Sequence, residues 1–73
     1  MSNSVSVAAA TDLATAYGEF CKLRVADDRT KADAINAVGV CHRLQGAQRE
    51  AGIELVADAK LAKLARFFEA EGA

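Results

Sequence analysis

The sequence predicts an all-α fold, in which an antiparallel two-helix hairpin is followed by a C-terminal helix. Three observations favour it. The chain contains no proline, apolar residues recur at the three- and four-residue spacing of a helix, and Thr30–Ala51 is the longest uninterrupted helical pattern. With 73 residues, the chain 1–73 is expected to form a single small helical domain.

The N-terminal part of the chain predicts one amphipathic helix. Residues 1–8 are rich in serine and are expected to be disordered. The first helix is expected from about Ala9 to Val25, and Thr11 could cap a later start. Its apolar side carries Leu13, Ala16, Tyr17, Phe20 and Leu23.

The central helix has clear signals at both ends. The polar connection 26–29 is short, which favours antiparallel packing of the helices on either side of it. Thr30 can act as the N-cap, and Asp33 complements the positive end of the helix dipole. At the other end, Gly52 can adopt the left-handed conformation while Ile53 folds back on the last turn, as in a Schellman motif.

The central helix carries more apolar and small-residue surface than one neighbour can cover. A broad face is shared by Ala34, Ala37, Val38, Cys41, Leu44, Ala47 and Ala51. A second stripe contains Ile35, Gly39, His42 and Gly46. The two glycines either allow close approach of another backbone or are merely tolerated. This second stripe is therefore available for another helix, a second copy or a partner.

The last part of the chain predicts a third helix. Residues 53–56 fit either a short extended segment or the first turn of that helix, and Gly52 could instead be a bend in one long helix. The helical pattern runs from Val56 to Phe68 and ends at Gly72. Its apolar stripe carries Leu61, Leu64 and Phe68, and beside it lie Lys60, Lys63 and Arg66.

Phe67 is expected to be exposed. Adjacent residues on a helix point about 100° apart, so when Phe68 joins the apolar stripe Phe67 points away from it. An exposed aromatic side chain beside an apolar stripe suits a protein interface. The alternative is a terminal helix that packs on both sides within a dimer.

The composition predicts a thin core and a homodimer. Apolar residues make up 52% of the chain, but 17 residues are alanine. Alanine is the best helix former and a poor core filler. Because small domains are marginal alone, we expect two copies to pack closely through alanine and glycine.

Charge and hydropathy narrow the classes of partner. The net charge is −1 and the pI is about 5.7, which argues against strong attraction to nucleic-acid phosphate. No apolar run approaches the roughly 18 residues of a membrane span, and the N-terminus lacks a positively charged signal region. We expect a cytoplasmic protein with no membrane partner, whose two cysteines are free thiols.

No constellation of residues predicts catalysis, a metal site or a cofactor. Cys21, Cys41 and His42 match no zinc spacing, and the adjacent Cys41 and His42 point about 100° apart on a helix. The segment 48–53 and the helix after it have the outline of a helix-turn-helix. The helix that would read DNA, however, has few side chains suited to base edges.

Three short segments carry a resemblance to a known group of proteins. They are Leu23-Arg24 before the short turn, Ala34-Ile-Asn-Ala-Val-Gly39, and Ala47-Gln-Arg-Glu. Together they resemble small helical-hairpin proteins encoded by bacteriophages, over roughly residues 13–54. The spacing after Gly39 departs from that pattern, and the helix around Leu61–Phe68 is additional. The resemblance implies a dimeric hairpin that inhibits host proteins, such as regulators of transcription or quorum sensing and components of immunity.

The sequence thus favours a non-enzymatic regulator or inhibitor that binds a host protein. The alternative is a small dimeric DNA-binding transcriptional regulator. The residues expected to contact the partner are exposed apolar or basic side chains of the central and last helices: Ile35, His42, Lys60, Lys63, Arg66 and Phe67.

Overall fold

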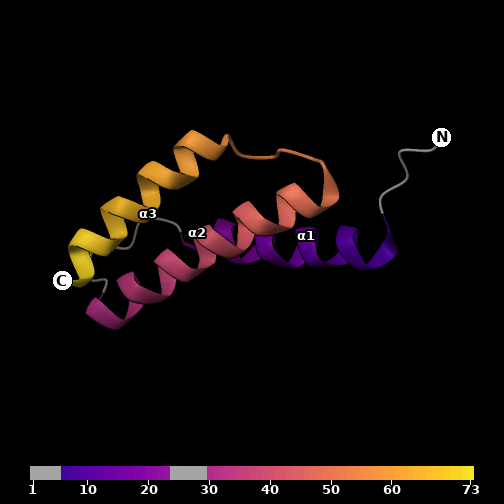
Figure 1. Ribbon diagram of the computed structural model, residues 1–73. Coiled ribbons are helices and arrows are strands. Elements are labelled where there is room, and N and C mark those ends of the chain that lie inside the picture. The colour runs from indigo at the N-terminus through magenta and orange to yellow at the C-terminus, as the bar shows by residue number, and fades with distance from the viewer. Residues whose placement is uncertain (1–5, 24–29) are drawn as a thin grey trace.

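The computed structural model describes residues 6–23 and 30–73 and places three α-helices in them (Figure 1). They are α1 (Val7–Cys21), α2 (Lys31–Ala51) and α3 (Asp58–Gly72). No residue of the described ranges lies in a strand, so the all-α prediction is confirmed. The expected connection 26–29 and the segment 1–5 lie outside the described residues.

Helix α1 begins and ends earlier than predicted. The Ser6 hydroxyl accepts a hydrogen bond from the amide of Ala9 at 3.0 Å and so caps the helix two residues before the expected start. Thr11 lies within the helix, so a later cap there is wrong. At the other end the helix stops at Cys21, and Leu23, which was expected to be helical, lies in a turn.

Both predicted ends of α2 are confirmed. The Thr30 amide donates to Asp33 Oδ2 and the Asp33 amide donates to Thr30 Oγ1, each at 3.1 Å, which forms a reciprocal capping box. Gly52 has φ of 70°, and the Ile53 amide donates to the Gln48 carbonyl at 3.1 Å. These two features, with the 3.3 Å bond from the Gly52 amide to the Arg49 carbonyl, form a Schellman motif.

A turn separates α2 from α3. Residues 53–57 are not helical, so Gly52 is not a bend in one long helix, and α3 begins two residues after the predicted Val56. The buried side chain of Gln48 holds this turn. Its Nε2 donates to the Val56 carbonyl at 3.0 Å, and its Oε1 accepts from the amides of Leu55 and Val56 at 2.8 Å each.

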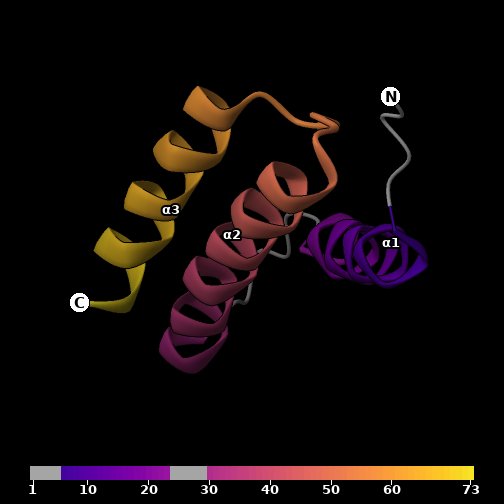
Figure 2. The ribbon, with the colours of Figure 1, turned by 45° about the vertical axis from the view of Figure 1, so that its right-hand side comes forward.

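The core lies along α2, which stands between α1 and α3 (Figure 2). One buried cluster joins all three helices and the other joins α2 to α3; Phe20 of α1 packs against both. Among the described residues the largest fully buried side chains are Leu44, Leu61 and Cys41, which agrees with the small core expected from the alanine content. The first cluster contains Ala9, Leu13, Ala16, Leu44, Ala51 and Leu61, and the second contains Ala37, Cys41, Ala65 and Phe68.

Two helices approach each other closely at Gly72, and not at Gly39 or Gly46, where the sequence allowed a close approach. A Cβ atom at Gly46 would meet nothing within 4 Å, and one at Gly39 would meet only the Arg43 side chain at 3.8 Å. Neither glycine therefore serves a close approach within the described chain. At Gly72 a Cβ atom would lie 3.0 Å from Ile35 Cγ1 and 3.6 Å from the Lys31 carbonyl oxygen, so the end of α3 packs tightly on the start of α2.

None of the three described helices is both long enough and apolar enough to cross a membrane.

Candidate functional site

Four of the predicted contact residues lie together on the exposed surface of α3. Lys60, Lys63 and Phe67 are three and four residues apart and share one side of the helix, with Arg66 next to Lys63. We call these four residues the α3 row. Phe67 is 52% exposed whereas Phe68 is 6% exposed, as the helical geometry predicted, and the two rings meet edge to face at 5.4 Å.

The α3 row faces solvent rather than the rest of the chain. Asp58, at the start of α3, accepts a hydrogen bond from Gln45 at 3.3 Å and pairs with Arg49 at 3.5 Å. Lys60 is two residues further along the helix and so points roughly 200° from Asp58. Within the described residues no ion pair involves Lys60, Lys63 or Arg66. The row therefore presents three cations and an aromatic ring to any partner.

The other two predicted residues do not join the α3 row. Ile35 is 61% exposed at the start of α2, beside Gly72. His42 is exposed, and its Nδ1 lies 3.1 Å from Gln45 Oε1, on the side of α2 that Asp58 contacts. The six predicted residues thus form two groups on different sides of the molecule.

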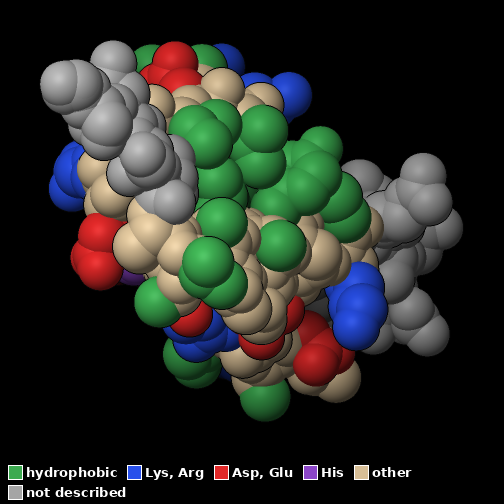
Figure 3. Space-filling view, turned by 90° about the vertical axis from the view of Figure 1, so that its right-hand side faces the viewer, with side chains coloured by type: hydrophobic (Ala, Val, Ile, Leu, Met, Phe, Trp, Pro, Cys, Tyr) green, Lys and Arg blue, Asp and Glu red, His purple; other side chains and the backbone are tan. Residues whose placement is uncertain are grey.

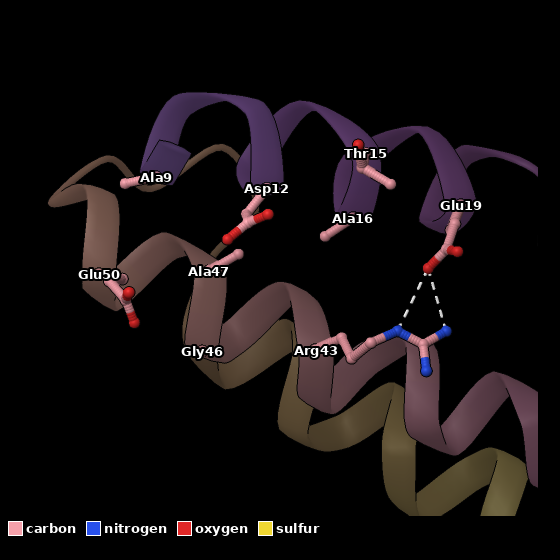
Figure 4. Close-up of a pocket in the computed structure, with 9 residues that line it drawn as sticks. All are labelled: Ala9, Asp12, Thr15, Ala16, Glu19, Arg43, Gly46, Ala47 and Glu50. Atoms are coloured by element: carbon pink, nitrogen blue, oxygen red, sulfur yellow. Dashed lines mark hydrogen bonds and ion pairs between the residues drawn. The ribbon is translucent and has the colours of Figure 1, made fainter. Parts of the chain in front are cut away.

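A groove between α1 and α2 is the feature that the sequence did not reveal (Figure 4). Its volume is about 410 Å³, and no residue of α3 lines it. The floor is made of small side chains, which keep it shallow and open. We call it the α1–α2 groove; it is lined by Ala9, Asp12, Thr15, Ala16, Glu19, Arg43, Gly46, Ala47 and Glu50.

The α1–α2 groove is acidic. Glu19 and Arg43 cross it at one end, where Glu19 Oε1 accepts from Arg43 Nε at 3.2 Å and from Arg43 Nη2 at 3.0 Å (Figure 4). Asp12 and Glu50 have no ion-pair partner among the described residues. Three carboxylates and one guanidinium leave a net charge of −2. The sequence did place these charges on the polar sides of two helices, but their convergence depends on how the helices cross.

The cysteines lie in different environments. Cys41 is buried, and its burial raises the pKa of its thiol because the charged thiolate is disfavoured there. Cys21 is exposed, and a hydrogen bond between the Tyr17 and Cys21 side chains is the main cause that raises the pKa of Tyr17. Among the described residues, no three His, Cys, Asp or Glu side chains are grouped so as to hold a metal ion.

Hydrophobic side chains also gather at one end of the molecule. Figure 3 views the side where the start of α1 and the turn after α2 lie, and apolar groups cover much of it. Val7 is 84% exposed, and Ile53 and Leu55 are 41% and 49% exposed. The Arg49–Asp58 ion pair lies beside the turn at this end, and the exposed side chains of Val7, Ile53 and Leu55 add apolar contact area.

Comparison with protein-family models, with curated protein sequences and with solved structures finds no match.

Proposed function

We propose that the protein is a non-enzymatic protein-binding regulator or inhibitor, encoded by a phage or mobile element and acting on a host protein. The observation that carries this proposal is the α3 row. A half-exposed phenylalanine beside three cations that form no ion pair among the described residues suits an interface, because aromatic residues and arginine are enriched at binding hot spots.

The α3 row suits an acidic protein surface with an apolar pocket. Phe67 would enter the pocket and supply most of the affinity, while Lys60, Lys63 and Arg66 would orient the partner and speed association. Inhibition would be steric, because a helix that fills a groove blocks whatever else binds there. Host defence and transcription are the processes suggested by the resemblance to phage hairpin proteins.

The proposal takes α1 and α2 as an antiparallel hairpin and the protein as a homodimer. In support of the hairpin, Ala9 near the start of α1 and Glu50 near the end of α2 line the same groove, which Glu19 and Arg43 cross further along. In support of the homodimer, the core contains few large side chains, and small domains of this kind gain stability by association.

A capture experiment tests the proposal. Tagged protein would be used to capture partners from bacterial lysate, beside a Phe67→Asp variant and an Asn36→Asp control. Asn36 is exposed on α2 and its change adds the same charge far from the α3 row. We expect the wild type and the Asn36 variant to capture the same protein and the Phe67 variant to lose it. Equal capture by all three would refute the role of the row.

The alternative function is that of a small dimeric DNA-binding regulator, since the cations of the α3 row could also meet phosphate. It predicts binding to duplex DNA that weakens steeply as salt increases. The acidic α1–α2 groove and the net charge of −1 oppose it. No retardation of DNA at low salt would remove this alternative.

A further inference from the structure

We infer that the α3 row of one copy docks into the α1–α2 groove of a second copy, so that self-association covers the surface proposed to bind the host protein. The regulatory part of this inference rests on the function proposed above. The contact itself rests on two complementary surfaces that the same chain carries and does not bring together.

The groove is the acidic half of the contact. Asp12 on α1 and Glu50 on α2 flank a floor of alanine and glycine, and within the described residues neither carboxylate has an ion-pair partner. A Cβ atom at Gly46 would meet nothing within 4 Å, so the floor is open to a helix from outside. Small residues are what allow two helices to approach closely.

The α3 row is the basic half. Phe67 can lie on the small-residue floor while the lysines beside it reach the carboxylates at the rims. The three cations Lys60, Lys63 and Arg66 extend over six residues of helix, about 9 Å, and the groove carries the carboxylates of Asp12, Glu19 and Glu50. The charges of the two surfaces are therefore complementary.

The contact has to form between two copies. No residue of α3 lines the groove of its own chain, and α3 packs against the other side of α2 through the buried cluster that contains Ala65 and Phe68. A contact between two different surfaces is head to tail. A dimer formed by one such contact leaves the groove of one copy and the α3 row of the other unoccupied.

This arrangement regulates the α3 row. A host partner that needs Phe67 and the lysines competes with the groove of a second copy for the same side chains. Self-association at high protein concentration would then lower the apparent affinity for the partner, and raised salt would weaken the self-contact, because its ion pairs lie at the surface.

Charge reversal on each half tests the contact. The groove variant carries Asp12→Lys and Glu50→Lys, and the row variant carries Lys60→Glu and Lys63→Glu. A control variant carries Lys22→Glu and Lys31→Glu, two exposed lysines outside both surfaces, with the same change of charge as the row variant. Circular dichroism checks that each is folded, and sedimentation gives the mass over a range of concentrations at about 0.01 M and about 1 M salt.

The wild type and the control are expected to associate at low salt and to dissociate towards the 7.7 kDa monomer at high salt. Each half variant alone should associate at least about a hundredfold more weakly, because like charges then face each other. An equimolar mixture of the two should form a one-to-one heterodimer, since one supplies an intact row and the other an intact groove. A chain with all four changes should associate again.

Three results would overturn the contact: a wild type that stays monomeric at low salt, half variants that associate as the wild type does, or a mixture that forms no heterodimer. The outcome is separable from that of the capture experiment. Loss of capture by Phe67→Asp together with a monomeric wild type would support the host contact and reject self-docking. Unchanged capture by Phe67→Asp, together with a wild type that associates and half variants that do not, would reject the host contact and support self-docking.

Discussion

Gln48 offers the sharpest test of how this small fold is held together. Its amide makes three hydrogen bonds to the backbone of the turn between α2 and α3, at 2.8, 2.8 and 3.0 Å, and the side chain is buried. Gln48→Leu keeps a side chain of similar size and removes all three bonds. The amides of Leu55 and Val56 and the carbonyl of Val56 then lose their partner.

The expected cost follows from the number of bonds. A hydrogen bond of this kind contributes about 0.5–1.5 kcal/mol, and an unpaired buried group costs about 1–3 kcal/mol. Leu55 is 49% exposed, so its amide can regain water, which lowers the total. We expect Gln48→Leu to lower the free energy of unfolding by about 2–4 kcal/mol. A domain of this size has roughly 4–11 kcal/mol in all.

Urea unfolding followed by circular dichroism measures this loss, and Gln45→Leu is the matched control. Gln45 lies three residues earlier on α2, and its two hydrogen bonds, to Asp58 at 3.3 Å and to His42 at 3.1 Å, are on the surface. Its loss should be less than about 1 kcal/mol. If Gln48→Leu costs no more than Gln45→Leu, the turn is not held by this amide and the argument fails.

Three further predictions concern single features of the helices. Gly52→Ala should destabilise the chain by about 1–2 kcal/mol in thermal unfolding, since Gly52 has φ of 70°. Gly18→Ala should stabilise it by up to about 1 kcal/mol, because a Cβ atom at Gly18 would meet nothing within 4 Å. A change of the same sign in both variants would contradict this. Arg43→Met should cost less than about 1 kcal/mol, because its pair with Glu19 is exposed, and a larger loss in urea unfolding would refute that. A thiol reagent at neutral pH should modify Cys21 rapidly and Cys41 slowly, since burial limits access to Cys41 and raises its pKa; equal rates would argue against the buried position.

The sequence predicted best the features that depend on neighbouring residues. Thr30 and Asp33 are three residues apart and cap each other, and Gly52 with Ile53 closes the same helix, so both ends of α2 could be located before any packing was known. The exposed position of Phe67 followed from its adjacency to Phe68 in the same way. The order and type of the helices were also predicted.

The features that depend on the crossing of helices were not predicted. Nothing in the sequence distinguished Gln48 from the exposed polar residues around it, because its partners lie seven and eight residues later in a turn of unknown shape. The α1–α2 groove likewise needs the relative rotation of two helices. The start of α1 was missed for a different reason, since a serine-rich segment fits a frayed end as well as it fits a cap at Ser6.

The high alanine content of the sequence accounts for both the small core and the surfaces that we propose as binding sites. Ala9, Ala16 and Ala47 lie where α1 meets α2, so little apolar volume is buried there. The same short side chains leave a shallow floor with charged residues standing at its rims. A core built in this way stabilises the chain weakly, and several larger apolar side chains, such as Phe67 and Ile35, remain exposed.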